Sequence, residues 1–327
     1  MFMSKMNPDL YHGNNKTSNF FEGWYFKLVD KSMTNALAII PGIYLGKSLE
    51  NSHSFIQILQ GNSAKYRYKR YNKDEFSTKS NSEFKISIAN SSFSLNEISL
   101  DIKDDINNIT GCVSFKNTLK WPDSYSNPGS MGYYNFIPFM QCYSQVCVMD
   151  MDLQGSLCIN GIEIDFNGGK GYIEKNWGSA FPYSWTWVQC NSFENTKTSI
   201  SCSIGHIPFM MSSFRGFLIG LFTDGKFYKF TNINNSTLAI VQNNLDVIIT
   251  SENRKYKLII ETKTSKKDFM LCMGPRDDKM VPLVDETLKG LVKVTLIDKQ
   301  ISKTIFYEEG LCCGIEYGGN QRMILSE

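Results

Sequence analysis

Short runs in which apolar and polar residues alternate recur along the chain, and they constrain the fold more than any other feature. Phe84–Ile88 and Ile162–Phe166 both follow this pattern, which lays one apolar and one polar face on a strand. Asn160-Gly161 stands directly before the second run, and Asp224-Gly225 separates two further apolar runs. Such pairs favour two-residue hairpins. We therefore predict antiparallel strands that mostly join sequence neighbours.

The composition agrees with a chain rich in strands and turns. Aromatic residues make up 13% of the sequence, and there are 24 glycines. A chain of 327 residues is long enough for about two domains. Lys120–Gly132 is rich in Pro, Ser, Asn and Gly, so we expect a loop there. Leu283, Leu288, Leu291 and Val292 fall roughly on one side of a helix, which predicts a short helix within Pro282–Lys293.

Two segments roughly half a chain length apart resemble each other. Phe20–Phe26 and Tyr172–Gly178 each combine an aromatic residue and a glutamate with a nearby tryptophan. Chance explains a likeness this weak, but a duplicated β domain explains it as well, with each copy opening on its own Glu/Trp strand. We accordingly divide the chain into an N-terminal β domain over residues 1–160 and a C-terminal β domain over 161–327. The boundary is expected between about Asp150 and Gly171.

Several classes of function have little support in the sequence. Lys plus Arg total 34 against 32 Asp plus Glu, so nothing indicates nucleic-acid binding. The three histidines form no close metal-ligand pair, and neither phosphate-binding nor dinucleotide-binding glycine motifs occur. There is also no stretch of 18 apolar residues and no apolar run typical of a secretory signal near the start. With nine cysteines in no regular spacing, we expect a cytoplasmic protein with reduced thiols.

One stretch is much more distinctive than the rest. Gly168–Pro182, continued through Trp185, Trp187, Gln189 and Asn191, resembles the signature of the tocopherol cyclase family. Phe21–Lys27 is similar to the N-terminal motif of that family, and His53–Gln57, Phe136–Met140 and Gly314–Gly319 add to the likeness. The pattern departs from bacterial relatives at Gln141 and Ser144, where those relatives tend to carry an acid and a histidine.

The resemblance implies an all-β fold of two lipocalin-like antiparallel β-barrel domains. Such a barrel encloses a cavity that holds one apolar ligand. It also implies the closure of a prenylated benzoquinol to a chromanol, a cofactor-free and acid-catalysed addition of a phenol to an alkene. The expected partner is a lipophilic small molecule, a prenylquinol or another isoprenoid, and a substrate of this kind would favour loose, peripheral contact with membranes.

Glu174 is the carboxyl group in the densest part of the signature, and Glu22 holds the matching place near the start. An alkene is a weak base, so its proton donor must be held dry against it, as a partly buried glutamate is. The structural alternative pairs Glu174 with Lys170 or Lys175, and it is slightly favoured because structural ion pairs outnumber catalytic acids. The functional hypothesis for Glu22 is a second acid or a base for the phenol. For this residue the structural alternative is favoured more clearly.

The aromatic and amide residues of the signature complete the candidate site. Indole rings stabilise a developing carbocation, although they also fill barrel cores. The candidate substrate-binding residues are Tyr172, Asn176, Trp177, Trp185, Trp187, Gln189 and Asn191. We expect Trp177, Trp187 and Glu174 to line one pocket, and we expect Trp24 to close a barrel end. No metal site is predicted.

Two other functions stay open at this point. A barrel cavity also carries lipophilic ligands without chemistry, and the departures at Gln141 and Ser144 favour such a binding protein. A hydratase that adds water to an isoprenoid alkene would use the same acid with a positioned water. The sequence does not separate these alternatives, and it does not predict the prenyl length or the oligomeric state.

Overall fold

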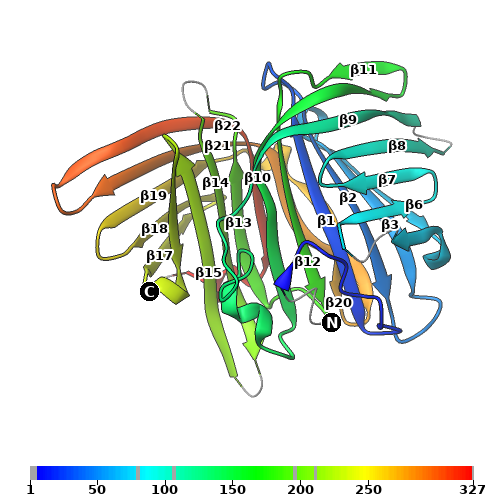
Figure 1. The fold of residues 1–327 in the computed structure, drawn as a ribbon, viewed down its shortest axis with the longest axis horizontal. Helices are drawn as coiled ribbons and strands as arrows, with labels where there is room; N and C mark the ends of the chain where they lie inside the picture. Colours follow the sequence, from blue (N-terminus) through cyan, green and yellow to red (C-terminus); the bar gives the residue numbers. More distant parts are fainter. Residues whose placement is uncertain (1–5, 79–81, 105–107, 194–196, 210–211, 326–327) are drawn as a thin grey trace. The chain divides into compact units, whose positions relative to one another are not determined.

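The computed structural model describes residues 6–78, 82–104, 108–193, 197–209 and 212–325. Two antiparallel sheets contain nearly all of the regular structure, so the predicted all-β fold is confirmed (Figure 1). No helix in these described ranges is long and apolar enough to cross a membrane.

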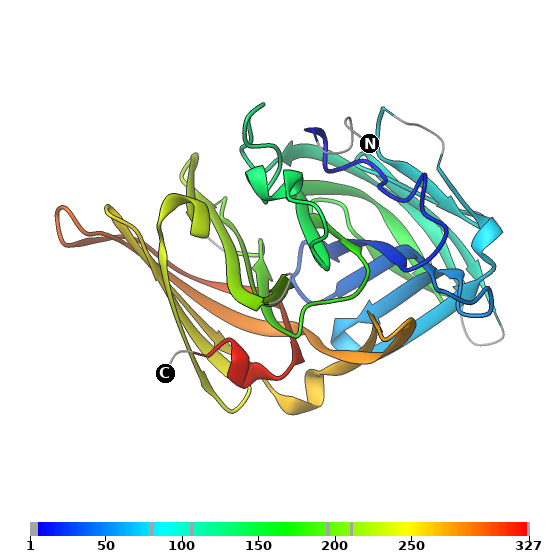
Figure 2. The ribbon, with the colours of Figure 1, turned by 90° about the horizontal axis from the view of Figure 1, so that it is seen from below.

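The first sheet has the strand order β4-β3-β2-β1-β12-β10-β9-β8-β7-β6-β5, with β11 paired to β10. Its strands are β1 (Phe20–Val29), β2 (Ala36–Leu45), β3 (His53–Gln60), β4 (Lys65–Tyr71), β5 (Phe76–Thr78), β6 (Lys85–Ile88), β7 (Ser91–Ser94), β8 (Glu97–Lys103), β9 (Asn108–Leu119), β10 (Cys142–Ile159), β11 (Ile162–Asp165) and β12 (Lys170–Gly178). The sheet curls around one apolar core, which takes side chains from both ends of the order, among them Ile56 of β3 and Ile86 of β6 (Figure 2).

The second sheet has the strand order β16-β15-β14-β13-β22-β21-β19-β18-β17, with β20 paired to β21. Its strands are β13 (Ser184–Cys190), β14 (Ser199–Phe209), β15 (Ser212–Thr223), β16 (Lys226–Thr231), β17 (Thr237–Asn243), β18 (Asp246–Glu252), β19 (Tyr256–Lys263), β20 (Met270–Arg276), β21 (Lys279–Asp298) and β22 (Lys303–Gly319). A separate apolar core, which includes Val188, Ile204 and Ile260, lies against this sheet.

Short 3₁₀ turns connect some of the strands. They are η1 (Gly61–Ser63), η2 (Lys73–Glu75), η3 (Gly132–Phe136), η4 (Asn232–Asn234), η5 (Lys266–Asp268) and η6 (Gln321–Met323). The hairpins predicted at Asn160-Gly161 and Asp224-Gly225 are confirmed, since they join β10 to β11 and β15 to β16. Lys120–Met131 is irregular apart from an isolated bridge between Ser124 and Asn127, as expected, and Gly132 begins η3.

The helix predicted within Pro282–Lys293 is wrong, because this segment belongs to the long strand β21. The register with β22 shifts between Thr287 and Gly290 and again between Gly290 and Val292. Such bulges insert unpaired residues and interrupt the two-residue alternation of side chains. Leu288 and Val292 are therefore both buried, at a spacing that imitates a helix.

The chain forms two compact units. The first is Met1–Gln60, Tyr66–Phe181 and Met273–Pro282, and the second is Gly61–Lys65, Pro182–Cys272 and Leu283–Glu327. Each sheet repeats the same scheme, in which the first four strands lie in reverse order and the first strand pairs with the last one. This shared order supports a duplication. The main division lies between Phe181 and Pro182, later in the chain than the expected boundary.

The two similar sequence segments are not corresponding strands of the two copies. Phe20–Val29 opens the first sheet and Lys170–Gly178 closes it, and the two strands pair directly, with Glu22 opposite Trp177. The strand in the second sheet that takes the place of β1 is β13. The duplication therefore follows from the strand order, whereas the Glu/Trp likeness joins two neighbours in one sheet.

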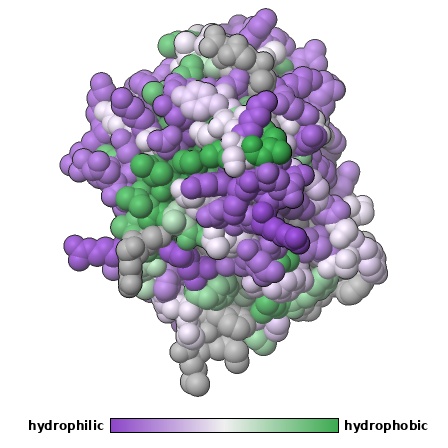
Figure 3. All heavy atoms as spheres, turned by 90° about the vertical axis from the view of Figure 1, so that its left-hand side faces the viewer, coloured by the Kyte–Doolittle hydropathy of each residue, from purple (hydrophilic) through white to green (hydrophobic). Residues whose placement is uncertain are grey.

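One face of the second unit carries exposed apolar side chains. Val241 and Ile248 lie opposite each other in β17 and β18, and both are exposed. Figure 3 views the molecule from the side on which Figure 1 places β17 to β19, and a band of hydrophobic atoms there is bordered by hydrophilic ones.

Candidate functional site

Strand β12 presents its site residues on two opposite faces. Side chains alternate along a strand, so Tyr172, Glu174 and Asn176 point to one face, and Lys175 and Trp177 point to the other. The face with Lys175 is turned toward the core of the first unit. The expectation that Glu174 and Trp177 line one pocket is therefore wrong, because residues three apart on a strand do not share a face.

On the face turned away from the core, Glu174 is held by its neighbours along the strand. The Tyr172 hydroxyl donates to Oε2 of Glu174 over 2.5 Å, and Nδ2 of Asn176 lies 3.5 Å from Oε1. Glu174 is only 7% exposed, and Tyr172 is fully buried. The ion pairs of the two lysines considered as its partners are with other residues: Lys175 pairs with Glu22, and Lys170 pairs with Asp150 and Asp152. Glu174 is thus a carboxyl group fixed in a largely dry position.

A line of accessible residues crosses three strands beside Glu174. Gly23 of β1 lies opposite Asn176, and Asn176 lies opposite Ser144 of β10. All three are partly exposed, and Gly23 is the one residue of β1 that is not buried. We call these three residues the accessible row. Ser144 is one of the two positions that depart from the family pattern, so this departure lies directly in the candidate site.

Glycine at position 23 keeps the floor of the accessible row low. A Cβ added to Gly23 would find Ile40 Cγ2 and Phe55 Cζ each at 3.8 Å, so these side chains stand at its sides without covering it. Gly42 pairs with Gly23, but there an added Cβ would lie 2.4 Å from Phe55 Cζ. The Phe55 ring therefore packs over Gly42. The accessible row has apolar side chains beside Gly23 and polar side chains at Asn176 and Ser144, with Glu174 next to it.

His53 belongs to the same face, two residues from Phe55 on β3. Its Nδ1 lies 2.7 Å from the Asn51 carbonyl oxygen, and its Nε2 lies 2.5 Å from the Tyr68 hydroxyl. A carbonyl accepts only, so Nδ1 donates and Nε2 accepts from Tyr68. Burial lowers the pKa of His53. The hydrogen bond to the Asn51 carbonyl acts in the opposite direction, and the charge of Arg70 lowers the pKa further. His53 is a neutral structural residue that fixes the aromatic wall.

On the core-facing side, Glu22 forms the centre of a buried polar cluster. Lys175 pairs with Oε1 of Glu22, and neither side chain has any exposed surface. The His12 backbone N–H donates to Oε2 over 2.8 Å, and His12 Nδ1 lies 3.2 Å from Oε1. The Lys175 ammonium also donates to the Leu10 carbonyl over 2.6 Å. The cluster ties the N-terminal segment to β1 and β12.

The charge state of Glu22 follows from these contacts. Burial alone would raise the pKa of Glu22, but the charges of Lys175 and His12 and the hydrogen bonds from both lower it below its ordinary value. Glu22 is therefore a carboxylate at neutral pH. The lysine that sequence analysis offered as a partner of Glu174 serves Glu22 instead. Its role could have been found from the antiparallel pairing of Phe20–Val29 with Lys170–Gly178, which places Lys175 opposite Trp24.

Aromatic rings enclose this cluster. The Lys175 ammonium lies 5.1 Å from the ring centroid of Trp24 and 4.9 Å from that of Trp177. Trp177 is stacked between His12, at 4.0 Å, and Tyr143, at 5.4 Å. These rings add cation–π contacts to a cation that is already paired. Trp177 thus supports a structural centre, and Trp24 is buried in the core of the first unit.

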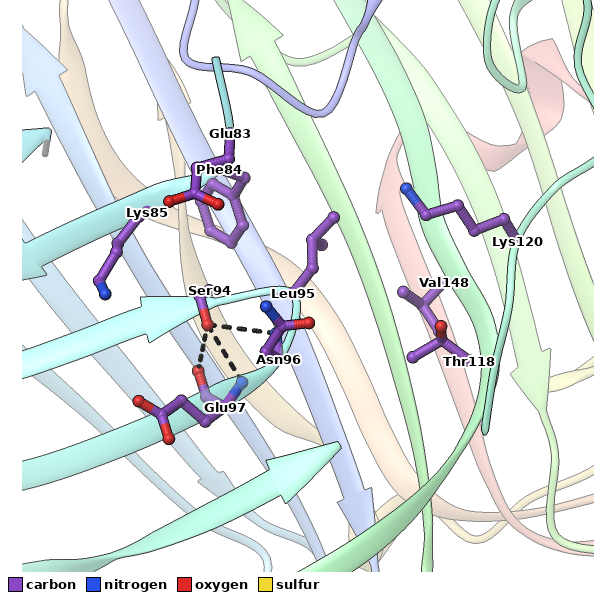
Figure 4. Close-up of a pocket in the computed structure, with 10 residues that line it drawn as sticks. All are labelled: Glu83, Phe84, Lys85, Ser94, Leu95, Asn96, Glu97, Thr118, Lys120 and Val148. Atoms are coloured by element: carbon purple, nitrogen blue, oxygen red, sulfur yellow. Dashed lines mark hydrogen bonds between the residues drawn. The ribbon is translucent and has the colours of Figure 1, made fainter. Parts of the chain in front are cut away.

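A pocket of about 270 Å³ opens in the first unit near Trp24 (Figure 4). Phe84 stacks on Trp24 at 5.2 Å and forms part of the apolar floor together with Leu95 and Val148. The rim is polar and carries charges of both signs. Lys120 on this rim donates to Asp9 over 3.1 Å, which connects the pocket to the N-terminal segment beside Lys175.

The remaining predicted site residues lie in the second unit. Val188 and Cys190 of β13 point to the core, so Trp185, Trp187 and Gln189 share the opposite face. Asn191 directly follows the strand, and all of these side chains are buried.

A carboxylate that sequence analysis overlooked joins this face of the second unit. Nε1 of Trp185 donates to Oε1 of Glu316, which lies opposite Trp187 in the register of β13 with β22. Glu286 of β21 is in turn opposite Glu316. The Gly314–Gly319 motif contains Glu316, so its place in the signature was the available signal. Within the described ranges, no group of three or more His, Cys, Asp or Glu side chains is arranged to hold a metal ion.

A family model matches most of the length of the chain. Residues 71–319 match the model of the family described as tocopherol cyclase-like. The chain belongs to the tocopherol cyclase-like family. Curated relatives include a probable chloroplastic tocopherol cyclase of Oryza sativa subsp. japonica, 25% identical over 185 residues, and the chloroplastic tocopherol cyclase of Zea mays, 24% identical over the same length. Each alignment covers 55% of this chain and 39% of the relative, so this tocopherol cyclase-like chain spans about two fifths of their length.

Solved structures support the lipocalin-like fold of this family member. CghA in complex with Sch210972 is 10% identical with a TM-score of 0.58, over 92% of this chain and 89% of that one. Kievitone hydratase from Nectria haematococca is 11% identical with a TM-score of 0.52, over 96% and 93%. At these identities the likeness concerns the fold alone.

Proposed function

We propose that this tocopherol cyclase-like chain closes a ring on a prenylated quinol, with Glu174 as the proton donor. The observation that carries the proposal is the place of Glu174, a buried carboxyl group on the face that also holds the accessible row. Family membership supports the reaction class. The fixed hydrogen bonds from Tyr172 and Asn176 support a role that needs precise orientation.

The proposed reaction is a net isomerisation that needs no cofactor. Glu174 gives its proton to one alkene carbon of the prenyl tail, and the other carbon becomes a tertiary cation. The phenol oxygen attacks this cation and forms the new C–O bond. The phenol proton then returns to the Glu174 carboxylate, directly or by exchange with solvent, so the acid is restored and all atoms balance. Exclusion of water is essential because a cation in contact with water would be hydrated instead.

The residues around Glu174 take distinct roles in this proposal. Asn176 and Ser144 hydrogen bond the quinol oxygens, since both have polar side chains and partial exposure. Tyr25 lies opposite Glu174, and Phe55 stands beside Gly23, so two aromatic rings are near the developing cation. A ring system rests on Gly23, where no side chain blocks it.

Glu22 is assigned to structure in this account. A carboxylate whose pKa is lowered by a buried ion pair with Lys175 cannot donate a proton at neutral pH. The rings of Trp24 and Trp177 make cation–π contacts with its partner Lys175. Its contribution to the reaction is to hold β12, and hence Glu174, in register with β1.

Incubation of the chain with prenylated quinols in heavy water tests the proposed function. Cyclisation places one non-exchangeable deuteron on carbon and leaves the mass otherwise unchanged. A hydratase adds the mass of water as well, and a carrier returns the quinol without deuterium on carbon. A chain that binds the quinol but incorporates no deuterium would contradict the proposal.

A further inference from the structure

The connection between β9 and β10 has an unusual composition. From Ser124 to Met149 the sequence contains no Asp, Glu, Lys or Arg, although charged residues make up 20% of the chain. The part that precedes β10 instead contains several Tyr, Phe and Pro residues. The run ends in the largely buried start of β10, but its exposed part before β10 still needs an explanation, because surface loops of globular proteins are normally polar and charged.

Four aromatic side chains of this connection are exposed to solvent. Their exposed fractions are 81% for Tyr125, 44% for Tyr133, 36% for Phe136 and 93% for Phe139. We call residues Ser124–Met140 the aromatic loop. It includes η3 and is the green-cyan segment that precedes β10 in Figure 1.

The aromatic loop is anchored at its base. The Gln145 side-chain oxygen accepts from the Ser130 backbone N–H over 2.8 Å, and the Tyr143 hydroxyl donates to the Ile137 carbonyl over 2.8 Å. Phe139 also has a φ of 66°, in the left-handed region that bulky residues rarely adopt. Strain of this kind persists only where the surrounding structure holds the residue in place. The loop therefore holds its aromatic side chains outward on a fixed base.

The aromatic loop lies at the end of the first unit where the pocket opens. Thr118 of β9 and Lys120, the first residue of the connection, line that pocket, and so does Val148 within β10 (Figure 4). In the antiparallel register, the turn between β2 and β3 belongs to the same end of the sheet, and it exposes Leu49. The aromatic loop and Leu49 therefore belong to the same end of the first sheet, and the start of the connection lines the pocket.

We propose that the aromatic loop docks the chain on the surface of a lipid bilayer. Tyr and Phe side chains suit the interfacial layer, where an apolar ring meets water and headgroups. The absence of charge indicates that docking does not depend on anionic lipids, which basic segments bind. This docking proposal rests on the proposed function in one respect: docking would allow the chain to take a lipid-soluble quinol from the membrane.

Flotation of the full chain with phosphatidylcholine vesicles tests this proposal. The native chain floats with these neutral vesicles, and added anionic lipid or salt changes the bound fraction less than twofold. The double variant Tyr125→Ser and Phe139→Ser lowers the partition coefficient at least tenfold. Tyr307→Ser is the matched control, because Tyr307 is an exposed aromatic residue of the second unit, and its partition coefficient stays at the native value.

A spectroscopic variant keeps the test independent of folding defects. All five tryptophans are buried, so Phe139→Trp adds a reporter at the loop tip. Its additional fluorescence is quenched by brominated lipid if the loop enters the interface. Equal flotation of the native chain and the double variant would overturn the proposal. So would binding that requires anionic lipid, or a change in self-association with unchanged flotation. Turnover of a short-chain, water-soluble quinol separates this proposal from the proposed function. The double variant should still turn over this substrate, which needs no membrane. Loss of the proposed cyclase function would abolish this turnover, whereas loss of membrane docking would not.

Discussion

Glu22 and Lys175 form an ion pair between neighbouring strands in which neither side chain reaches solvent. Removing two charges from water is costly, and the cost is offset only when further hydrogen bonds complete the pair. His12 and the Leu10 carbonyl supply these bonds. The pair therefore fixes the N-terminal segment to the strands that carry the candidate acid.

Loss of Lys175 should destabilise the first unit strongly. In Lys175→Met, Glu22 keeps its burial but loses its main cation, and breaking such a pair costs about 3–5 kcal/mol. The free energy of unfolding in urea is the measurement. Lys170→Met is the matched control, since Lys170 and its partner Asp152 are partly exposed, and it should cost much less. Equal effects of the two substitutions would show that the buried pair has no special weight.

The acid stability of the chain should depend on Glu22. Its pKa in the folded state is below the ordinary value of 4.5, so the pair stabilises the fold fully above that pH. The stabilisation is lost as the pH falls through the lower, folded-state pKa. The difference in unfolding free energy between the native chain and Glu22→Gln should therefore be largest above pH 4.5 and shrink in more acid solution. A difference that stays constant down to strongly acid pH would contradict the lowered pKa.

The paired glycines of β1 and β2 should respond differently to the same substitution. Gly42→Ala places a methyl group against the Phe55 ring and the Glu22 carbonyl, and overpacking of this kind costs about 1–3 kcal/mol. Gly23→Ala meets no atom closer than 3.8 Å, so its stability should change by less than about 1 kcal/mol.

For Gly23→Ala the predicted loss is in the handling of substrate. The methyl group fills the accessible row and should raise KM for the quinol, which steady-state kinetics measures beside the melting curve. Native KM in Gly23→Ala would place the substrate elsewhere.

The fold class could be predicted because strand alternation and two-residue turns are local signals. Asn160-Gly161 fixes a hairpin by its own backbone preferences, whatever lies around it. The helix prediction around Leu288 failed because the bulges in β21 arise from its pairing with β22. A local sequence pattern contains no information on that pairing. The likeness of the two Glu/Trp segments identified real neighbours but the wrong relationship.

The candidate site could be predicted in part. Glu174, Tyr172 and Asn176 share a face because they are two apart, and this could be read from the sequence. By the same rule Trp177 had to lie on the opposite face. The roles of His12 and Ser144 depend on long-range register, since His12 comes from the N-terminal segment and Ser144 from β10. No spacing in the sequence indicates either contact.

The most direct test of the account is the deuterium uptake of Glu174→Gln. Glutamine keeps the size of the side chain and its capacity to hydrogen bond, but it has no proton to transfer. If Glu174 is the general acid, incorporation of deuterium into the cyclised product should fall about 10²–10⁴-fold, while quinol binding and the melting temperature change little. Native incorporation by a fully folded Glu174→Gln protein would contradict the account, and so would a loss that merely follows the unfolded fraction.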